Sequence, residues 1–302
     1  MAKALQLLAT PKFSILCFVA PPQQTRQEIA QQDKSHNLTP TAKLYLADTY
    51  AFSSTAVVEA VQDGDAVSSH RLALNQTVFH PQGGGQPSDA GEIIQGCHAF
   101  KVAMVKQDGE GVIWHCGTFL NGSEPFKVGA TVDLRIDGEA RKLHARLHSA
   151  GHALDTAVKN CGFGALKPLK GFHFVEGPYV EYEGAVGAEQ RDAFLKDVNA
   201  EMANVTLAAP CFYLATNPLA QVPFPCSNAS VTLSLHLTPT QLIALDHPTL
   251  VKVEGDVRHV TVASLSCPCG GTHVRSTAEL GEVEVTKVKV KKGNTRVSYK
   301  MR

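Results

Sequence analysis

The sequence predicts an α+β protein in which a β-rich first half, folded as a small barrel or sandwich, precedes a mixed second half. Three observations predict this order. Short strand-like runs fill residues 43–137, an amphipathic helix begins directly after them, and a strictly alternating hairpin lies near the C-terminus. The 302 residues, 44% hydrophobic and 19% charged, allow about two globular domains.

The first forty residues lack sustained hydrophobic periodicity, and residues 21–36 are rich in glutamine. We expect a weakly ordered extension over 1–42, a β-barrel domain over 43–137 and a second domain over 138–302. An organelle-targeting role for the extension is a minor alternative, since Pro11 and the scarcity of arginine do not fit a leader.

Runs of β-branched and aromatic residues predict the strands of the first domain at 43–46, 56–61, 112–115 and 131–136. Asp-Gly or Asn-Gly turns at 63–64, 108–109 and 121–122 separate such runs. Many short strands with frequent turns are typical of small barrels and sandwiches.

The hydrophobic period changes after residue 137. Apolar residues at helical spacing predict a helix over 139–160 that ends at Gly162. We expect strands at 177–182, near 211, at 230–237 and at 257–263, and a helix over 188–205. A closing hairpin joins 281–291 to 295–299 through a turn at Gly293 and Asn294.

Composition excludes several classes of protein. Lys+Arg and Asp+Glu both number 28, so any nucleic-acid contact must come from a local patch. No run approaches the ~20 apolar residues that span a bilayer, so we expect no integral membrane protein. The eight cysteines lack the regular spacing of a disulfide scaffold.

Two pairs of residues have the spacing of metal ligands. His148 and His152 lie four residues apart in the predicted helix, so both imidazoles lie on one face. Cys269 and His273 flank Gly270 and Gly271, which let the backbone turn tightly enough for both to face one ion.

Together these four residues predict one zinc ion, either in a closed structural site or in a hydrolytic site that opens one position. The spacing of His148 and His152 is explained equally well by two polar histidines on the helix surface that bind no metal. Cys267 is a second-ranked substitute for Cys269. Ser149 stands where a zinc protease has its general-base Glu, which disfavours a peptidase.

The segment from Phe79 to Gly91 holds three consecutive glycines followed by Gln86. Such glycines allow a ligand or another loop to approach the backbone closely, although a plain turn between strands has the same composition.

Taken together, the sequence resembles the AlaX family, the free-standing relatives of the editing domain of alanyl-tRNA synthetase, and is similar to the editing domain of threonyl-tRNA synthetase. The resemblance covers residue 43 to the C-terminus. Its three motifs are the glycine segment 79–91, the HxxxH helix at 146–152 and the CGGTHV run at 269–274, followed by 276–281. The chain looks like the intermediate-length form of the family.

The resemblance implies an editing domain behind the barrel and hydrolysis, without ATP, of tRNA(Ala) mischarged with serine, or with glycine as a second candidate. It implies zinc held by His148, His152, Cys269 and His273, in a cytoplasmic protein. Gly151 departs from the family's Thr-Ala-Thr between the helix histidines, and no family glutamine follows the helix near 167–171. Both departures concern amino-acid preference.

Two residues are candidates for substrate contact. We expect Ser149 to pair with the hydroxyl of a serine substrate, or alternatively to bond back to its own helix. The resemblance suggests that Gln86 borders the acceptor end. Local positive charge predicts RNA contacts by Arg141, Lys142, Arg146, Lys291 and Lys292, for which a solvated strand face is the alternative at the hairpin.

Two other functions remain open. A non-catalytic RNA-binding protein would use the same four ligands as a structural zinc site. A zinc hydrolase of small esters or peptides lacks the helix Glu.

Overall fold

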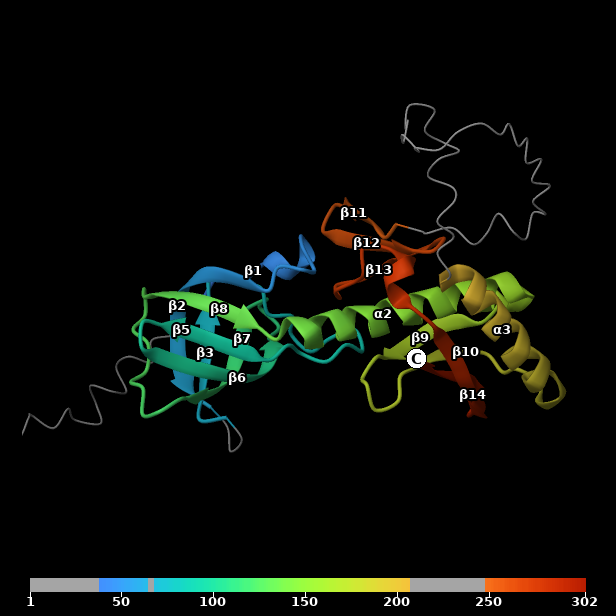
Figure 1. Cartoon of the computed structure of the whole chain (residues 1–302), viewed down its shortest axis with the longest axis horizontal. Helices are drawn as coiled ribbons and strands as arrows, with labels where there is room; N and C mark the ends of the chain where they lie inside the picture. Colours follow the sequence, from blue (N-terminus) through green and yellow to red (C-terminus); the bar gives the residue numbers. More distant parts are fainter. Residues whose placement is uncertain (1–37, 65–67, 207–247) are drawn as a thin grey trace, which may run out of the picture. The chain divides into compact units, whose positions relative to one another are not determined.

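Six antiparallel strands close into a barrel in the N-terminal half of the described region. The computed structural model describes residues 38–64, 68–206 and 248–302. The barrel order is β2-β3-β7-β6-β5-β8 (Figure 1). The strands are β2 (Ser53–Asp63), β3 (His70–Leu74), β5 (Gly91–Gln95), β6 (His98–Gln107), β7 (Ile113–Phe119) and β8 (Thr131–Ile136). Alternate residues point inward, as Val132, Leu134 and Ile136 do on β8, so the barrel interior is a packed core.

A short segment before the barrel departs from the predicted strand at 43–46. Strand β1 (Ala42–Lys43) pairs in parallel with β4 (Gln76–Thr77), and Leu44–Leu46 then form the 3-10 helix η1. This turn buries Tyr45 in the barrel core while the backbone N–H groups of Ala47 and Asp48 donate to the carbonyl of Leu44. The predicted strand at 43–46 was wrong because three consecutive apolar residues, 44–46, fit one helical turn as well as an extended strand.

Helix α2 (Gly138–Val158) begins where the barrel ends, as predicted. Asp137 caps it by accepting from the backbone N–H groups of Glu139 and Ala140 at 3.1 and 3.0 Å. A π-helical turn, η2 (Lys159–Phe163), follows, and Gly162 within it adopts the left-handed conformation at φ 87°.

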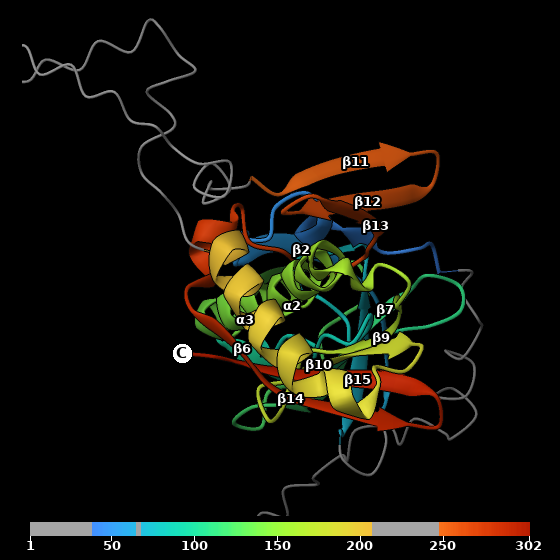
Figure 2. The ribbon, with the colours of Figure 1, turned by 90° about the vertical axis from the view of Figure 1, so that its right-hand side faces the viewer.

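Two helices cover a four-stranded sheet of order β14-β15-β10-β9 (Figure 2). The strands are β9 (Lys167–Phe172), β10 (Tyr179–Glu183), β14 (Val283–Lys291) and β15 (Asn294–Met301), and the 3-10 helix η3 (Ala188–Gln190) precedes helix α3 (Arg191–Thr206). Leu154 of α2, Phe194 of α3 and Val297 of β15 share one core. The hairpin turn lies at Lys292 and Gly293, both at positive φ, one residue earlier than predicted.

A three-stranded meander completes the described fold. It contains β11 (Leu250–Glu254), β12 (Val257–Val262) and β13 (Leu265–Pro268), and the 3-10 helix η4 (Thr277–Leu280) follows. The strand predicted at 257–263 is confirmed, whereas those near 211 and at 230–237 lie outside the described residues. The α+β prediction with an N-terminal barrel is also confirmed. Within the described ranges, no helix combines the length and hydropathy needed to cross a membrane.

Arg141 links helix α2 to the barrel rather than to solvent. Its side chain is 0% exposed, and its Nε lies 3.1 Å from both carboxylate oxygens of Asp89. Its guanidinium also donates to the carbonyl of Thr49 at 2.9 Å. These bonds correct the expectation that Arg141 contacts RNA. A buried arginine requires such a partner, and losing one member of a buried pair costs about 3–5 kcal/mol.

Candidate metal centre

Four potential ligands from two distant segments converge between helix α2 and the loop after β13. One ligand atom from each of His148, His152, Cys269 and His273 lies within 4.8 Å of every other. Within residues 38–64, 68–206 and 248–302 this is the one group of three or more His, Cys, Asp or Glu side chains that could hold a metal. The structure therefore brings together all four residues that the sequence predicts as ligands.

The loop 269–273 reaches the helix because Gly271 carries no side chain. A Cβ atom there would lie 2.2 Å from Cε1 of His148, far inside van der Waals contact. The backbone N–H of Cys269 donates to the carbonyl of Arg258 at 3.0 Å, which anchors the start of the loop on β12. His273, four residues later, places its Nε2 3.3 Å from Cys269 Sγ.

Gln86 fixes the tautomer of His148. Its Oε1 accepts from the backbone N–H of Thr272 at 3.1 Å, and its Nε2 donates to the Thr272 hydroxyl at 2.8 Å. Oε1 also lies 2.8 Å from His148 Nδ1, so Nδ1 must carry the proton that this bond requires. The unprotonated Nε2 of His148 then points toward Cys269 Sγ, 3.4 Å away. This is the form of imidazole that binds a metal.

Ser149 supports His273 in a similar way. Its hydroxyl oxygen lies 3.2 Å from His273 Nδ1 and accepts from the backbone N–H of Val274 at 3.1 Å. The side chain is 0% exposed. Gln86 is also fully buried. Both side chains therefore contact ligand histidines and the neighbouring backbone instead of facing a substrate.

His152 has its own partners. Its Nδ1 lies 3.2 Å from Cys267 Sγ and 3.7 Å from Asp155 Oδ2. Cys267 thus contacts one ligand, whereas Cys269 belongs to the converging group of four. This geometry favours Cys269 as the ligand and leaves Cys267 beside it.

Burial and mutual contact shift the protonation of these groups. Burial, reinforced by the neighbouring histidines, holds the pKa values of His148 and His273 well below 6.5. Burial opposes ionisation of Cys269, but His152, the Gly271 N–H and Arg258 outweigh it and lower the pKa of the thiol. Burial opposes protonation of His152, but Asp155, Cys267 and Cys269 outweigh it and raise the pKa of this ring well above 6.5. A metal ion would therefore meet two neutral imidazoles and an ionisable thiol, and would displace a proton from His152.

The donor set fits zinc. Three imidazole nitrogens and one thiolate match the borderline-soft preference of Zn²⁺, and four protein ligands match its tetrahedral coordination. His148, His152, Cys269 and His273 would hold such an ion.

His173 is a neighbour of the centre that the sequence interpretation missed. Its ring stacks on His148 with centroids 4.6 Å apart, and its Nδ1 lies 2.7 Å from the Tyr299 hydroxyl. Burial lowers its pKa to about 3. A Cβ atom at Gly151 would lie 2.4 Å from His173 Cε1, so the glycine in the helix makes room for this ring. The glycine between the two ligand histidines was the signal that could have found it.

The other predicted RNA contacts lie apart from the four ligands. Lys142 is 43% exposed and pairs with Glu139 at 2.8 Å. Arg146 donates to the carbonyl of Leu280 at 2.9 Å and so anchors the end of η4. Lys291 and Lys292 are exposed at the β14–β15 turn.

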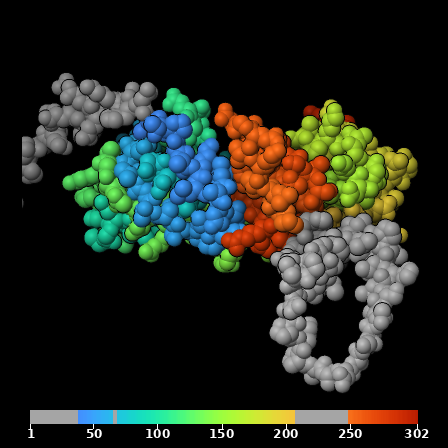
Figure 3. Space-filling view, turned by 90° about the horizontal axis from the view of Figure 1, so that it is seen from above, coloured from blue at the N-terminus to red at the C-terminus, as the bar shows by residue number. Residues whose placement is uncertain are grey.

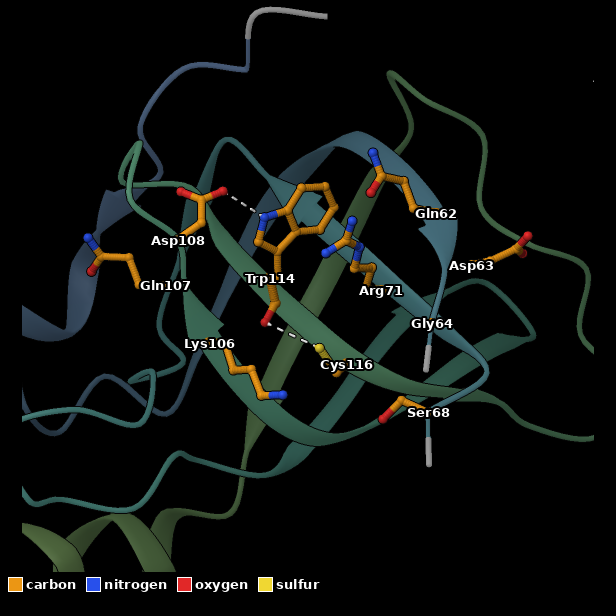
Figure 4. A pocket seen from close by; sticks show the side chains of 10 residues that line it. All are labelled: Gln62, Asp63, Gly64, Ser68, Arg71, Lys106, Gln107, Asp108, Trp114 and Cys116. Carbon is orange, nitrogen blue, oxygen red and sulfur yellow. Dashed lines mark hydrogen bonds between the residues drawn. The ribbon is translucent and has the colours of Figure 1, made fainter. Parts of the chain in front are cut away.

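The barrel has a cavity of about 570 Å³ (Figure 4). None of the residues that line it is a predicted metal ligand. The Arg71 guanidinium lies 4.4 Å from the Trp114 ring centroid, and the indole N–H donates to Asp108 at 2.9 Å. These contacts pair Trp114 with Arg71 and Asp108 within the lining. The candidate site is therefore the group of four converging residues rather than this cavity.

Two families match the sequence. Residues 22–140 match tRNA synthetases class II (A), and residues 249–298 match the threonyl and alanyl tRNA synthetase second additional domain. The second match includes Cys269 and His273. It covers the meander, the ligand loop and most of the β14–β15 hairpin.

Individual relatives extend these matches over most of the chain. The alanyl-tRNA editing protein AlaX-M of Pyrococcus horikoshii is 26% identical over 82% of this chain and 91% of its own length, and that of Methanosarcina barkeri is 28% identical over 86% and 98%. The alanine–tRNA ligase of Caldivirga maquilingensis is 29% identical over 87% of this chain, which spans only 27% of that ligase. Both family models match parts of the chain, and the AlaX-M proteins match it over most of its length, so the chain is similar to the alanyl-tRNA editing proteins.

Proposed function

We propose that this protein is a zinc-dependent hydrolase that removes wrongly attached amino acids from tRNA(Ala), with serine the principal and glycine the second. The observation that carries the proposal is the convergence of His148, His152, Cys269 and His273 within 4.8 Å. The similarity to alanyl-tRNA editing proteins over nearly their whole length supports tRNA(Ala) as the partner.

A zinc ion bound by these ligands supplies Lewis acidity toward an ester carbonyl and toward water. The chain's own residues prepare the site for it. Gln86 keeps the proton of His148 on Nδ1, and Ser149 orients the ring of His273. Both are positioning residues in this proposal, so the role of pairing with a serine hydroxyl passes from Ser149 to a group still to be identified.

The serine preference rests on the family resemblance, and deacylation of tRNA(Ala) charged with different amino acids tests it. We assign the reaction to the cytoplasm, where the substrate arises by misacylation. The exposed Lys291 and Lys292 remain proposed phosphate contacts, since such side chains position RNA without discriminating its sequence.

The test is a panel of tRNA(Ala) charged with serine, glycine, alanine or threonine and incubated with the full chain. Zinc content is measured on the same samples. We expect rapid loss of the seryl ester, slower loss of the glycyl ester and little loss of the alanyl ester. His152→Ala, checked for its fold by circular dichroism, should lose both metal and hydrolysis. Stable seryl-tRNA(Ala) in the presence of the zinc-loaded wild-type protein would contradict the proposal.

One observation favours a second candidate, an RNA-binding protein with a structural zinc site. Four protein ligands already complete a tetrahedral zinc shell, and His148 and His273 are both buried. In that case the panel shows full zinc occupancy and tRNA binding but no ester loss.

A further inference from the structure

A cavity of about 160 Å³ borders the metal centre at His273. One wall is the segment 46–50, and the other comes from the meander and the residues after the ligand loop. The space-filling view shows these two parts of the chain, blue and orange to red, meeting on one face (Figure 3). We call this the His273 cavity; its polar lining consists of Asp48, Thr49, Tyr50, Thr249, Arg258, Arg275 and His273 itself.

Hydrogen bonds tie the walls of the His273 cavity together. The backbone N–H of His273 donates to the Thr49 hydroxyl at 3.2 Å, and the Thr49 carbonyl accepts from the buried Arg141. On the other wall the backbone N–H of Thr249 donates to the carbonyl of Arg275 at 2.8 Å. The cavity is therefore built by tertiary contacts from several segments.

Two buried polar atoms of the lining residues lack a partner within the described part of the chain, namely Nε of Arg258 and the hydroxyl oxygen of Thr249. The Arg258 side chain is held in place, since its NH1 donates to the carbonyls of Cys269 and Gly271 at 2.8 and 3.1 Å. Buried polar groups are normally satisfied, so a donor and a hydroxyl without protein partners at one cavity are available to a ligand with acceptor oxygens.

The lining also supplies cationic donors for an anion. Arg258 and Arg275 contribute two positive charges. The Asp48 carboxylate lies 4.0 Å from Arg275, and the Glu279 carboxylate, outside the lining, accepts from the Tyr50 hydroxyl and from the Arg275 backbone N–H. The Arg275 guanidinium lies 4.2 Å from the Tyr50 ring centroid, and the side chain is 70% exposed. A guanidinium stacked on an aromatic ring presents its N–H edge to phosphate oxygens, here beside the Asp48 carboxylate, and provides a surface for a nucleobase.

We propose that the His273 cavity binds a backbone phosphate of the single-stranded 3′ end of the tRNA, with Arg275 and Arg258 as its charged donors and the Tyr50–Arg275 stack beneath an adjoining base. This inference rests on the proposed function. The ester to be hydrolysed lies on the terminal ribose, and one CH₂–O link joins that ribose to its own phosphate. A phosphate site therefore has to lie about one nucleotide from the metal ligands, and His273 is both a ligand and part of this cavity wall.

The test compares two arginines in matched surroundings. Arg275 stacks on Tyr50 near Asp48, and Arg296 stacks on Tyr179 at 4.0 Å with Glu181 as its ion-pair partner. Only the first lines the His273 cavity. Binding of an uncharged single-stranded RNA ending in CCA is measured by fluorescence anisotropy between 50 and 300 mM salt, with the full-length wild type, Arg275→Gln and Arg296→Gln.

We expect Arg275→Gln to reduce the slope of log affinity against log salt by about 0.7, the value for one phosphate contact on a single strand. Arg296→Gln should leave the slope unchanged. Arg275→Lys, which keeps the charge, should restore most of the slope. Equal slopes for wild type and Arg275→Gln would overturn the inference. The inference would also be overturned if inorganic phosphate displaced the labelled RNA as effectively, at equal phosphate concentration, as unlabelled RNA does.

Because this RNA carries no amino acid, the measurement is independent of hydrolysis. If the slope depends on Arg275 but seryl-tRNA(Ala) stays intact, the proposed function fails and the phosphate site stands. If the ester is hydrolysed and Arg275→Gln leaves both slope and KM unchanged, the phosphate site fails alone. With both correct, Arg275→Gln raises KM and leaves kcat unchanged.

Discussion

The barrel and the metal centre both bury histidines, but they use them differently. In the barrel, His115 lies alone, with Nε2 2.8 Å from the Thr77 hydroxyl and Nδ1 3.2 Å from the Leu72 carbonyl. Both ring nitrogens are occupied by local partners. At the metal centre, the Nδ1 atoms of His148 and His273 have such partners, and their Nε2 atoms lie within 3.4 Å of one sulfur.

The difference shows that burial by itself does not identify a site. A histidine bonded at both nitrogens stabilises a core, whereas several histidines bonded at one nitrogen each leave their second nitrogens for a shared ligand. Substitutions in each of the two regions test this distinction.

Removing a converging ligand should differ sharply from removing its neighbour. Loss of a residue that hydrogen-bonds a metal ligand typically lowers metal affinity by up to ~100-fold. We expect Cys269→Ser, which removes a ligand itself, to lower zinc affinity by more than this. Cys267→Ser should retain one zinc per chain. The measurement is competition against a fluorescent zinc chelator. Equal losses in the two variants would show that Cys267 shares the ion.

The fully buried barrel histidine, His115, should make stability depend on pH. Burial lowers the pKa of His115 from 6.5 to about 4, so between these values the unfolded chain binds the extra proton. The resulting stability is fully present above pH 6.5 and is lost as pH falls toward 4, by about 3 kcal/mol.

Urea unfolding of wild type, His115→Gln and His98→Gln at pH 7.0 and 4.5 measures this loss. His98 lies on β6 of the same barrel and is partly exposed. His115→Gln should lose less stability on acidification than the other two. The same loss in all three would place the acid sensitivity elsewhere.

Gln86→Leu tests whether support for Nδ1 matters at the metal centre. We expect a loss of about 10- to 100-fold in zinc affinity, because the Nδ1–H of His148 would lose its acceptor. Gln86→Glu keeps an acceptor and should retain more affinity than Leu. Gln82→Leu, on the exposed part of the same glycine segment, is the matched control. Unchanged zinc affinity in Gln86→Leu would remove the positioning role.

The smallest effect is expected at the junction of the two regions. Asp137→Ala removes the cap of α2 and should cost about 1 kcal/mol in the free energy of unfolding without changing zinc affinity. Asp133→Ala, on an exposed position of β8, serves as the control. A fall in zinc affinity would mean that the cap also positions His148.

Much of this fold follows from local pattern. The period of α2, the left-handed Gly162 just beyond it and the alternation of the closing hairpin are encoded in neighbouring residues, so the sequence predicts them. The converging ligands were also predictable in identity, because HxxxH and CGGTH are local spacings.

Contacts between distant segments were not predictable. Arg141 looks like a surface cation in the sequence, and only the fold brings Asp89 to it from 52 positions away. Gln86 and Thr272 are 186 positions apart, and their contact turns an expected substrate neighbour into a support for His148. Where a polar side chain has a partner across the fold, its own neighbourhood in the sequence says little about its role.

Gly151 also bears on how this protein could be engineered. Replacing a mid-helix glycine with alanine is a standard way to raise thermal stability, since glycine costs about 1 kcal/mol relative to alanine there. Here the added methyl group would clash with the imidazole of His173, which stacks on the ring of His148. Stabilising substitutions should therefore avoid Gly151 and be placed at exposed positions away from the four converging ligands.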